Sequence, residues 1–161
     1  MIRLSVDSGL VNGLLARIPD HQLRYEQGCL VGHFKLPVGA ATAVIVPACR
    51  DSELVFSIPF SQIRGDLTGR FLLSKLTSAL WGTISQRIER AVRPVLLRQG
   101  LPANTVRLDR RRERDGDVGE VVVCLSSLNR WLAGRHPRLR LGVAGVHFHP
   151  AGLELLAEVS H

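Results

Sequence analysis

The sequence predicts an α+β domain in which a curved antiparallel sheet of about seven or eight strands wraps one long amphipathic helix, with two short helices at the ends. Three observations support this prediction. One stretch alone, residues 69–98, carries a long helical period of apolar residues. The segments on both sides of it alternate as strands do, and turn-forming residues separate those segments. We treat residues 1–161 as a single domain, because the chain is long enough to bury one core.

The long helix is predicted from apolar positions that recur every three or four residues and so form one stripe. These positions are Leu73, Leu76, Leu80, Ile84, Ile88, Val92 and Val95. Thr68 is the expected N-cap. Pro94 is expected to kink the helix or to end it near that residue, and Gly100 and Pro102 should terminate the helix at the latest. Leu96 and Leu97 extend the apolar character beyond what one sheet would cover. That surplus fits a core, a ligand cavity or a dimer interface.

Before the long helix, the pattern predicts a strand at 1–5 and a short helix that Asp7 or Ser8 caps and that ends near Ile18. Residues 22–36 read as a strand or hairpin with Gly28 and Gly32 at turns or bulges. Two further strands are expected at 40–47 and 54–59. In the second, Leu54, Phe56 and Ile58 should face one way.

After the long helix, a hairpin is predicted from 105–112 and 118–125 around an Asp-Gly-Asp turn. Ser126 or Ser127 should then cap a short helix that ends at Ala133. Residues 139–148 and 153–159 form the last predicted hairpin.

Two parts of the chain resemble each other. At an offset of 117 residues, the short helix after residue 6 matches the one after residue 123, and Asn12 matches Asn129. One interpretation is two related β-α-β-β units, 1–60 and 104–161, joined by the helix 69–98. The alternative is that any two capped short amphipathic helices would match as well.

The opening strand, a short helix with a Leu-Asn-x-x-Leu-like element and a run of antiparallel strands resemble the small bacterial tubular lipid-binding (TULIP-like) proteins. The element appears at Val11, Asn12, Leu14 and Leu15, and again at Leu128, Asn129, Trp131 and Leu132. The resemblance implies that a hydrophobic molecule binds between helix and sheet. The chain departs from that family in placing the second unit after the long helix.

Composition favours a globular protein with anionic partners. Hydrophobic residues make up 45% and the net charge is +7, which suits phospholipid head groups, nucleic acid or an acidic protein. Three cysteines show no CxxC spacing, which fits a reducing compartment. With no export signal or apolar run long enough to span a bilayer in the sequence, we expect a cytoplasmic location.

Catalytic and metal-binding patterns are weak. No nucleophile, phosphate-loop or zinc-protease motif occurs, so we expect no enzyme activity and no cofactor. His147 and His149 alternate on one strand, and Glu154, Glu158 or His33 would have to complete a metal site. A solvated strand face explains the two histidines more simply, and we predict no metal.

The leading functional hypothesis is non-enzymatic binding of a hydrophobic or amphipathic ligand, most simply a lipid, in a groove between the long helix and the sheet. The predicted ligand-binding residues are Leu76, Leu80, Trp81, Ile84, Ile88 and Arg87. One alternative is a scaffold protein that forms a homo-oligomer through the helix. The other is an arginine arm that meets nucleic acid or an anionic membrane surface, with the candidates Arg107, Arg110, Arg111, Arg112 and Arg114. Acidic residues among these arginines also fit a simple charged edge strand.

Overall fold

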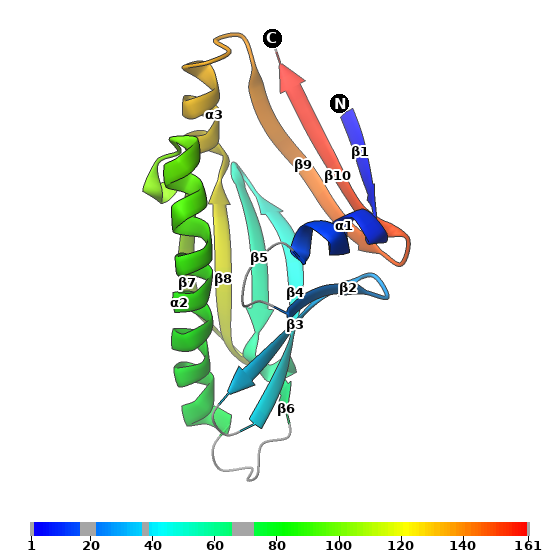
Figure 1. Ribbon diagram of the computed structural model, residues 1–161, viewed down its shortest axis with the longest axis vertical. Coiled ribbons are helices and arrows are strands. Elements are labelled where there is room, and N and C mark those ends of the chain that lie inside the picture. The colour runs from blue at the N-terminus through cyan, green and yellow to red at the C-terminus, as the bar shows by residue number, and fades with distance from the viewer. Residues whose placement is uncertain (1, 17–21, 37–38, 66–72, 161) are drawn as a thin grey trace.

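The computed structural model describes residues 2–16, 22–36, 39–65 and 73–160 and shows an α+β chain (Figure 1). Three α-helices are described: α1 Ser8–Leu15, α2 Leu73–Gln99 and α3 Leu125–Ala133. The strands of the first half are β1 Ile2–Asp7, β2 Gln22–Glu26, β3 Cys29–Leu36, β4 Gly39–Arg50, β5 Glu53–Pro59 and β6 Arg64–Gly65. Those of the second half are β7 Val106–Glu113, β8 Gly116–Cys124, β9 Arg140–His149 and β10 Gly152–Ser160. The predicted α+β class with antiparallel strands is confirmed.

The strands form two sheets where the sequence analysis expected one. A 3-stranded sheet has the order β1-β10-β9, and a 7-stranded sheet has the order β2-β3-β4-β5-β8-β7 with β6 added beside β4. Every described pair of strands is antiparallel. The difference arises because β1 pairs with β10, at the far end of the chain, and no local pattern encodes that pairing.

The long helix α2 runs lengthwise beside β7 and β8 (Figure 1). Trp81 and Ile84 of this helix belong to the core cluster that also holds Ile45 of β4 and Ile58 of β5. Ile84 and Ile58 are each only 1% exposed. The strand alternation predicted for β5 is confirmed in part, since Phe56 and Ile58 both face α2.

The long helix does not end at its proline. It continues through Pro94 to Gln99, so of the predicted kink or end at Pro94 the end is wrong, whereas the predicted stop at Gly100 is confirmed. Pro94 is exposed, and the backbone carbonyl it leaves unbonded can take water instead. The true end is at Gly100 (φ +68°), where the Leu101 N–H donates to the Leu96 carbonyl at 2.8 Å. Thr68, the predicted N-cap, lies outside the described residues.

The caps of the short helices were predicted with mixed success. Asp7 caps α1, because its carboxylate accepts the Leu10 N–H at 2.9 Å. The segment 17–21, where this helix was expected to end, lies outside the described residues. Helix α3 has Cys124 at its N-cap position. Ser126 and Ser127 therefore lie within the first turn and do not cap the helix.

The two matched asparagines make the same pair of hydrogen bonds. Asn12 of α1 accepts the Tyr25 N–H at 2.6 Å and donates to the Tyr25 carbonyl at 3.1 Å. Asn129 of α3 accepts the Leu141 N–H and donates to the Leu141 carbonyl, each at 2.8 Å. Each short helix is thus fastened to the next strand of the chain by one amide side chain.

Tyr25 also links the two sheets. Its hydroxyl accepts the His149 N–H at 2.9 Å and donates to the His149 carbonyl at 2.7 Å. Its ring meets Phe148 edge-on, with the centroids 5.5 Å apart. Burial of this ring and hydroxyl raises the pKa of Tyr25. The β2–β3 hairpin is therefore fixed against the turn between β9 and β10.

Candidate functional site

An apolar cavity of about 200 Å³ lies between α2 and the 7-stranded sheet. Helix α2 forms one wall, and β2, β3, β4, β5 and β8 form the others. All ten side chains that line it are aliphatic or aromatic: Leu23, Leu30, Ile45, Phe56, Ile58, Ile84, Ile88, Ala91, Val92 and Val121. A cavity with such walls offers an apolar ligand a place to leave water and offers a polar ligand no hydrogen bond.

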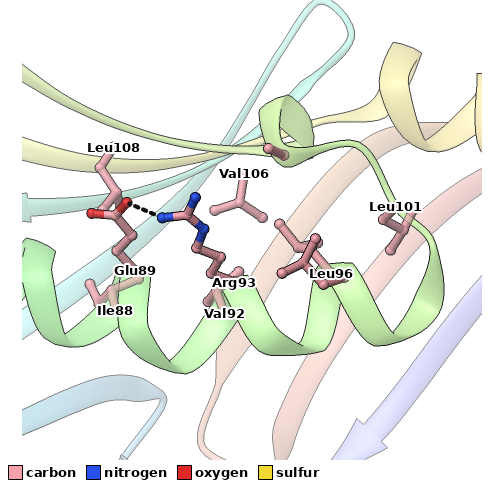
Figure 2. A pocket seen from close by; sticks show the side chains of 10 residues that line it. Ile88, Glu89, Val92, Arg93, Leu96, Leu101, Val106 and Leu108 are labelled. Atoms are coloured by element: carbon pink, nitrogen blue, oxygen red, sulfur yellow. Dashed lines mark ion pairs between the residues drawn. The ribbon is translucent and has the colours of Figure 1, made fainter.

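A larger groove of about 410 Å³ lies between the C-terminal half of α2 and β7 (Figure 2). It is lined by Ile88, Glu89, Val92, Arg93, Leu96, Leu97, Leu101, Ala103, Val106 and Leu108. Ile88 and Val92 line both spaces. The cavity and the groove are therefore neighbours that share the wall formed by these two side chains.

The polar part of the groove is a single ion pair at its rim. Arg93 Nη1 lies 3.9 Å from Glu89 Oε1, and the two side chains are 69% and 61% exposed. Figure 2 shows this pair above the apolar wall formed by Ile88, Val92 and Leu96. The groove thus combines an apolar floor with one cation and one anion at its mouth.

Simple periodicity positions these side chains. Ile84, Ile88, Val92 and Leu96 are four residues apart, so they form one row along α2. At the C-terminal end of this row, the turn that ends the helix brings Leu101 back beside Leu96.

The structure brings together two of the six predicted ligand-binding residues. Ile84 and Ile88 line the cavity. Trp81 does not, because it packs against Phe60 at 6.1 Å between ring centroids and against Gly119. Arg87 is half-buried and lines neither the cavity nor the groove. The side chains of Leu76 and Leu80 lie outside the described part of the chain.

The predicted ligand-binding set did not include the residues that line the groove toward the end of α2, although the sequence analysis named Leu96 and Leu97 as a surplus that would fit a ligand cavity. Val92, Leu96 and Leu97 follow or flank Pro94, where the helix was expected to kink or end. The surplus of apolar residues at this end of the helix was the available signal. Leu101, Val106 and Leu108 come from the segment after the helix, and only the fold brings them to it.

The predicted arginine arm lies on β7 and its turn, and much of its charge is neutralised within the protein. Arg107 contacts Asp109 at 2.7 Å and Glu53 at 3.2 Å. Arg111 contacts Glu113 at 2.6 Å and the buried Glu120 at 3.1 Å.

Of the other arm residues, Arg110 pairs with Asp117 and stacks over the Phe60 ring. Arg112 and Arg114 are exposed, and among the described residues neither has a carboxylate partner. Of the five predicted arginines, Arg112 and Arg114 therefore present their charge to solvent without a carboxylate partner among the described residues.

Metal ligands do not gather in the described part of the chain, where no three His, Cys, Asp or Glu side chains are close enough to hold an ion. His147 lies opposite Glu154 on the neighbouring strand, but the Glu154 carboxylate bonds to Arg3 at 2.7 Å.

Two thiols have shifted acidities. The hydroxyl of Ser126 and backbone N–H groups at the start of α3 lower the pKa of Cys124 to about 7. Burial raises the pKa of Cys49.

Among the described helices, none combines the length and the apolar character that crossing a bilayer requires.

Comparison of the chain with protein-family models, with curated proteins and with solved structures found no significant match. The resemblance to tubular lipid-binding proteins therefore stays a prediction.

Proposed function

We propose that this protein binds a hydrophobic or amphipathic small molecule, most simply a lipid, without chemical conversion, in the space between α2 and the 7-stranded sheet. The observation that carries the proposal is the cavity with ten apolar lining residues, beside which the larger groove shares Ile88 and Val92. In this proposal the strands curve around α2 as in a lipid-binding tube, and the ligand lies along the row from Ile84 to Leu96.

The groove favours a ligand with an apolar chain and a polar end. Apolar surface that leaves water here contributes roughly 25 cal/mol per Å² to binding. Arg93 stands at the rim, and its contact with Glu89 is long and exposed. Arg93 is placed to meet an anionic head group, whereas the charged residue in the predicted ligand-binding set was Arg87.

The experiment is a titration with the fluorescent apolar probe 1-N-phenylnaphthylamine. Val92→Trp places a large ring at a position that lines both the cavity and the groove, and we expect it to abolish the fluorescence increase. The matched control is Val95→Trp on the same helix, because Val95 is 55% exposed and lines neither space. Equal binding by both variants would contradict the proposal.

Self-association through α2 is the second candidate function. It is supported by two large apolar side chains that the helix leaves exposed, Val95 at 55% and Leu97 at 69%. Light scattering across a range of protein concentrations separates this function from that of a monomeric carrier, and Leu97→Glu should dissociate any dimer.

Nucleic-acid binding by the arginine arm is supported less well, because Arg107, Arg110 and Arg111 are already paired with carboxylates.

The proposed compartment is the cytoplasm. Three free thiols among the described residues, Cys29, Cys49 and Cys124, support a reducing environment.

A further inference from the structure

A second set of arginines lies at the end of the molecule where α2 ends, α3 lies and β9 begins (Figure 1). We call it the α3 tip and define it as Arg98 with residues 130–140. It contains five arginines: Arg98, Arg130, Arg135, Arg138 and Arg140. All five are exposed.

The α3 tip has almost no negative charge. Between Glu120 and Glu154 the sequence contains no acidic residue. None of the five arginines forms an ion pair within the described part of the chain. The nearest carboxylate in the strand register is Glu158, which lies opposite Gly142 on the neighbouring strand. The α3 tip therefore differs from the arginine arm on β7, where carboxylates of the protein neutralise three of the five arginines.

The tip also carries apolar and aromatic groups among its charges. The Arg135 guanidinium lies 4.2 Å from the centroid of the half-buried Trp131 ring. The Trp131 indole N–H donates to the Gln99 carbonyl at 3.0 Å, at the end of α2. Pro137 and Leu139 lie between the arginines, around an open depression of about 350 Å³. Indole rings and arginines beside apolar side chains are the groups that settle at a membrane interface.

The tip adjoins the open groove. Trp131 bonds to Gln99, and Leu101, two residues further along the chain, lines that groove with Leu96 and Leu97. We propose that the α3 tip docks the protein on an anionic phospholipid surface, with the groove next to the bilayer. This inference rests on the proposed function for its purpose, because docking there brings the groove to a source of lipid.

A membrane explains the tip better than a nucleic acid does. Single-stranded nucleic acid is bound by aromatic rings with faces open for base stacking, and the described part of the tip offers one indole, whose face Arg135 already covers. A bilayer needs no stacking face. It takes up Leu139 and Trp131 at the head-group level while the arginines meet lipid phosphates.

The test is co-sedimentation of the full chain with vesicles of phosphatidylcholine alone or with about one third phosphatidylglycerol. We expect binding to the anionic vesicles only, weakening as salt rises. In the variant Arg138→Glu/Arg140→Glu the loss should exceed about 25-fold, since each arginine near the surface contributes roughly fivefold.

The matched control is Arg112→Glu/Arg114→Glu, which lowers the net charge by the same four units. These residues lie at the turn between β7 and β8, about 30 Å from α3 along the nine residues of β8. The control should bind vesicles nearly as well as the wild type. Equal loss in both variants would mean that net charge alone drives binding, and it would overturn the proposal. Tighter binding to a 20-nucleotide single strand through the same arginines would overturn it in favour of nucleic acid.

A second measurement uses the intrinsic fluorescence of Trp131. Its emission should shift to shorter wavelength on anionic vesicles, and Trp131→Phe should remove that shift. The tip variant should still bind 1-N-phenylnaphthylamine in solution. Loss of vesicle binding with the probe still bound separates failure of docking from failure of the ligand site.

Discussion

The indole ring of Trp81 occupies the space that a side chain at Gly119 would need. A Cβ atom on Gly119 would lie 2.4 Å from two carbons of the ring, closer than any real contact. Gly119 therefore lets α2 approach β8, and Trp81 is only 8% exposed. Through this contact the strand holds the helix over the cavity.

Gly119→Ala should displace the Trp81 ring and lower the free energy of unfolding by about 1–3 kcal/mol. The displaced ring should weaken the near-ultraviolet circular dichroism signal, and a denaturant titration measures the loss of stability. Gly82→Ala is the control, because a Cβ there meets nothing within 4 Å. In a helix it should stabilise by roughly 0.5–1 kcal/mol. If Gly119→Ala were neutral, the close approach of helix and strand would be wrong.

Asn12→Ala and Asn129→Ala should each lower the free energy of unfolding by about 1–3 kcal/mol, because each leaves an N–H and a carbonyl of the next strand without their partner. The two losses should be similar, since the hydrogen bonds are the same. Urea titrations of both variants measure this. A large loss at one site with none at the other would count against related roles for the two asparagines.

The buried Glu120 carboxylate depends on two arginines. The Glu120 side chain is 4% exposed, and its Oε1 lies 2.5 Å from Arg50 Nη2 and 3.1 Å from Arg111 Nη2. The side chains of Arg50 and Arg111 are 42% and 50% exposed. Arg50→Met/Arg111→Met should cost about 3 kcal/mol or more of stability, because a buried charge is left uncompensated.

Glu120→Gln should cost less, about 1 kcal/mol, because the two arginines it leaves can turn to water. Thermal unfolding of both variants gives the comparison. The reverse order of stabilities would show that the carboxylate is not buried as described.

Cys124 should be the most reactive thiol near neutral pH. Its pKa of about 7 lies below the ordinary 9.0, chiefly because of the Ser126 hydroxyl. The thiolate is therefore present above pH 7 and is lost as the pH falls through that value. In a Cys29→Ser/Cys49→Ser background, the rate of iodoacetamide alkylation should reach half its maximum near pH 7.

Ser126→Ala should move that midpoint toward pH 9, since it removes the largest cause of the shift. An unchanged midpoint in Ser126→Ala would assign the acidity to the backbone of α3 alone.

Local patterns predicted the helices and hairpins. The apolar positions whose spacing predicted α2 include Ile84 and Ile88, which line the cavity. The Asp-Gly-Asp segment gave the turn between β7 and β8, and positive φ at Gln27 and Gly28 accounts for the tight turn between β2 and β3.

Contacts between distant segments were not predictable. The pairing of Ile2 with Ala157 splits the strands into two sheets, and no spacing within the sequence specifies it. Trp81 left the predicted ligand set because a glycine in a strand 38 positions later accommodates its ring. The neutralisation of Arg107 by Glu53 is likewise a product of the fold.

A filled core and a lined cavity use the same kinds of residue, and Ile84 belongs to both. A charged residue at Ile84 would therefore unfold the protein and report nothing on ligand binding. Val92 is the better position to probe, because it lines both spaces and is not part of the core cluster.

Native mass spectrometry of the freshly purified full chain, alone and with added long-chain fatty acid, tests the ligand site most directly. The wild type should carry one extra mass that solvent extraction releases as an apolar molecule, or should take up one fatty acid. Val92→Trp should show the bare mass in both samples, while Val95→Trp should behave as the wild type does. A wild-type chain that stays bare in both samples would contradict the proposed function.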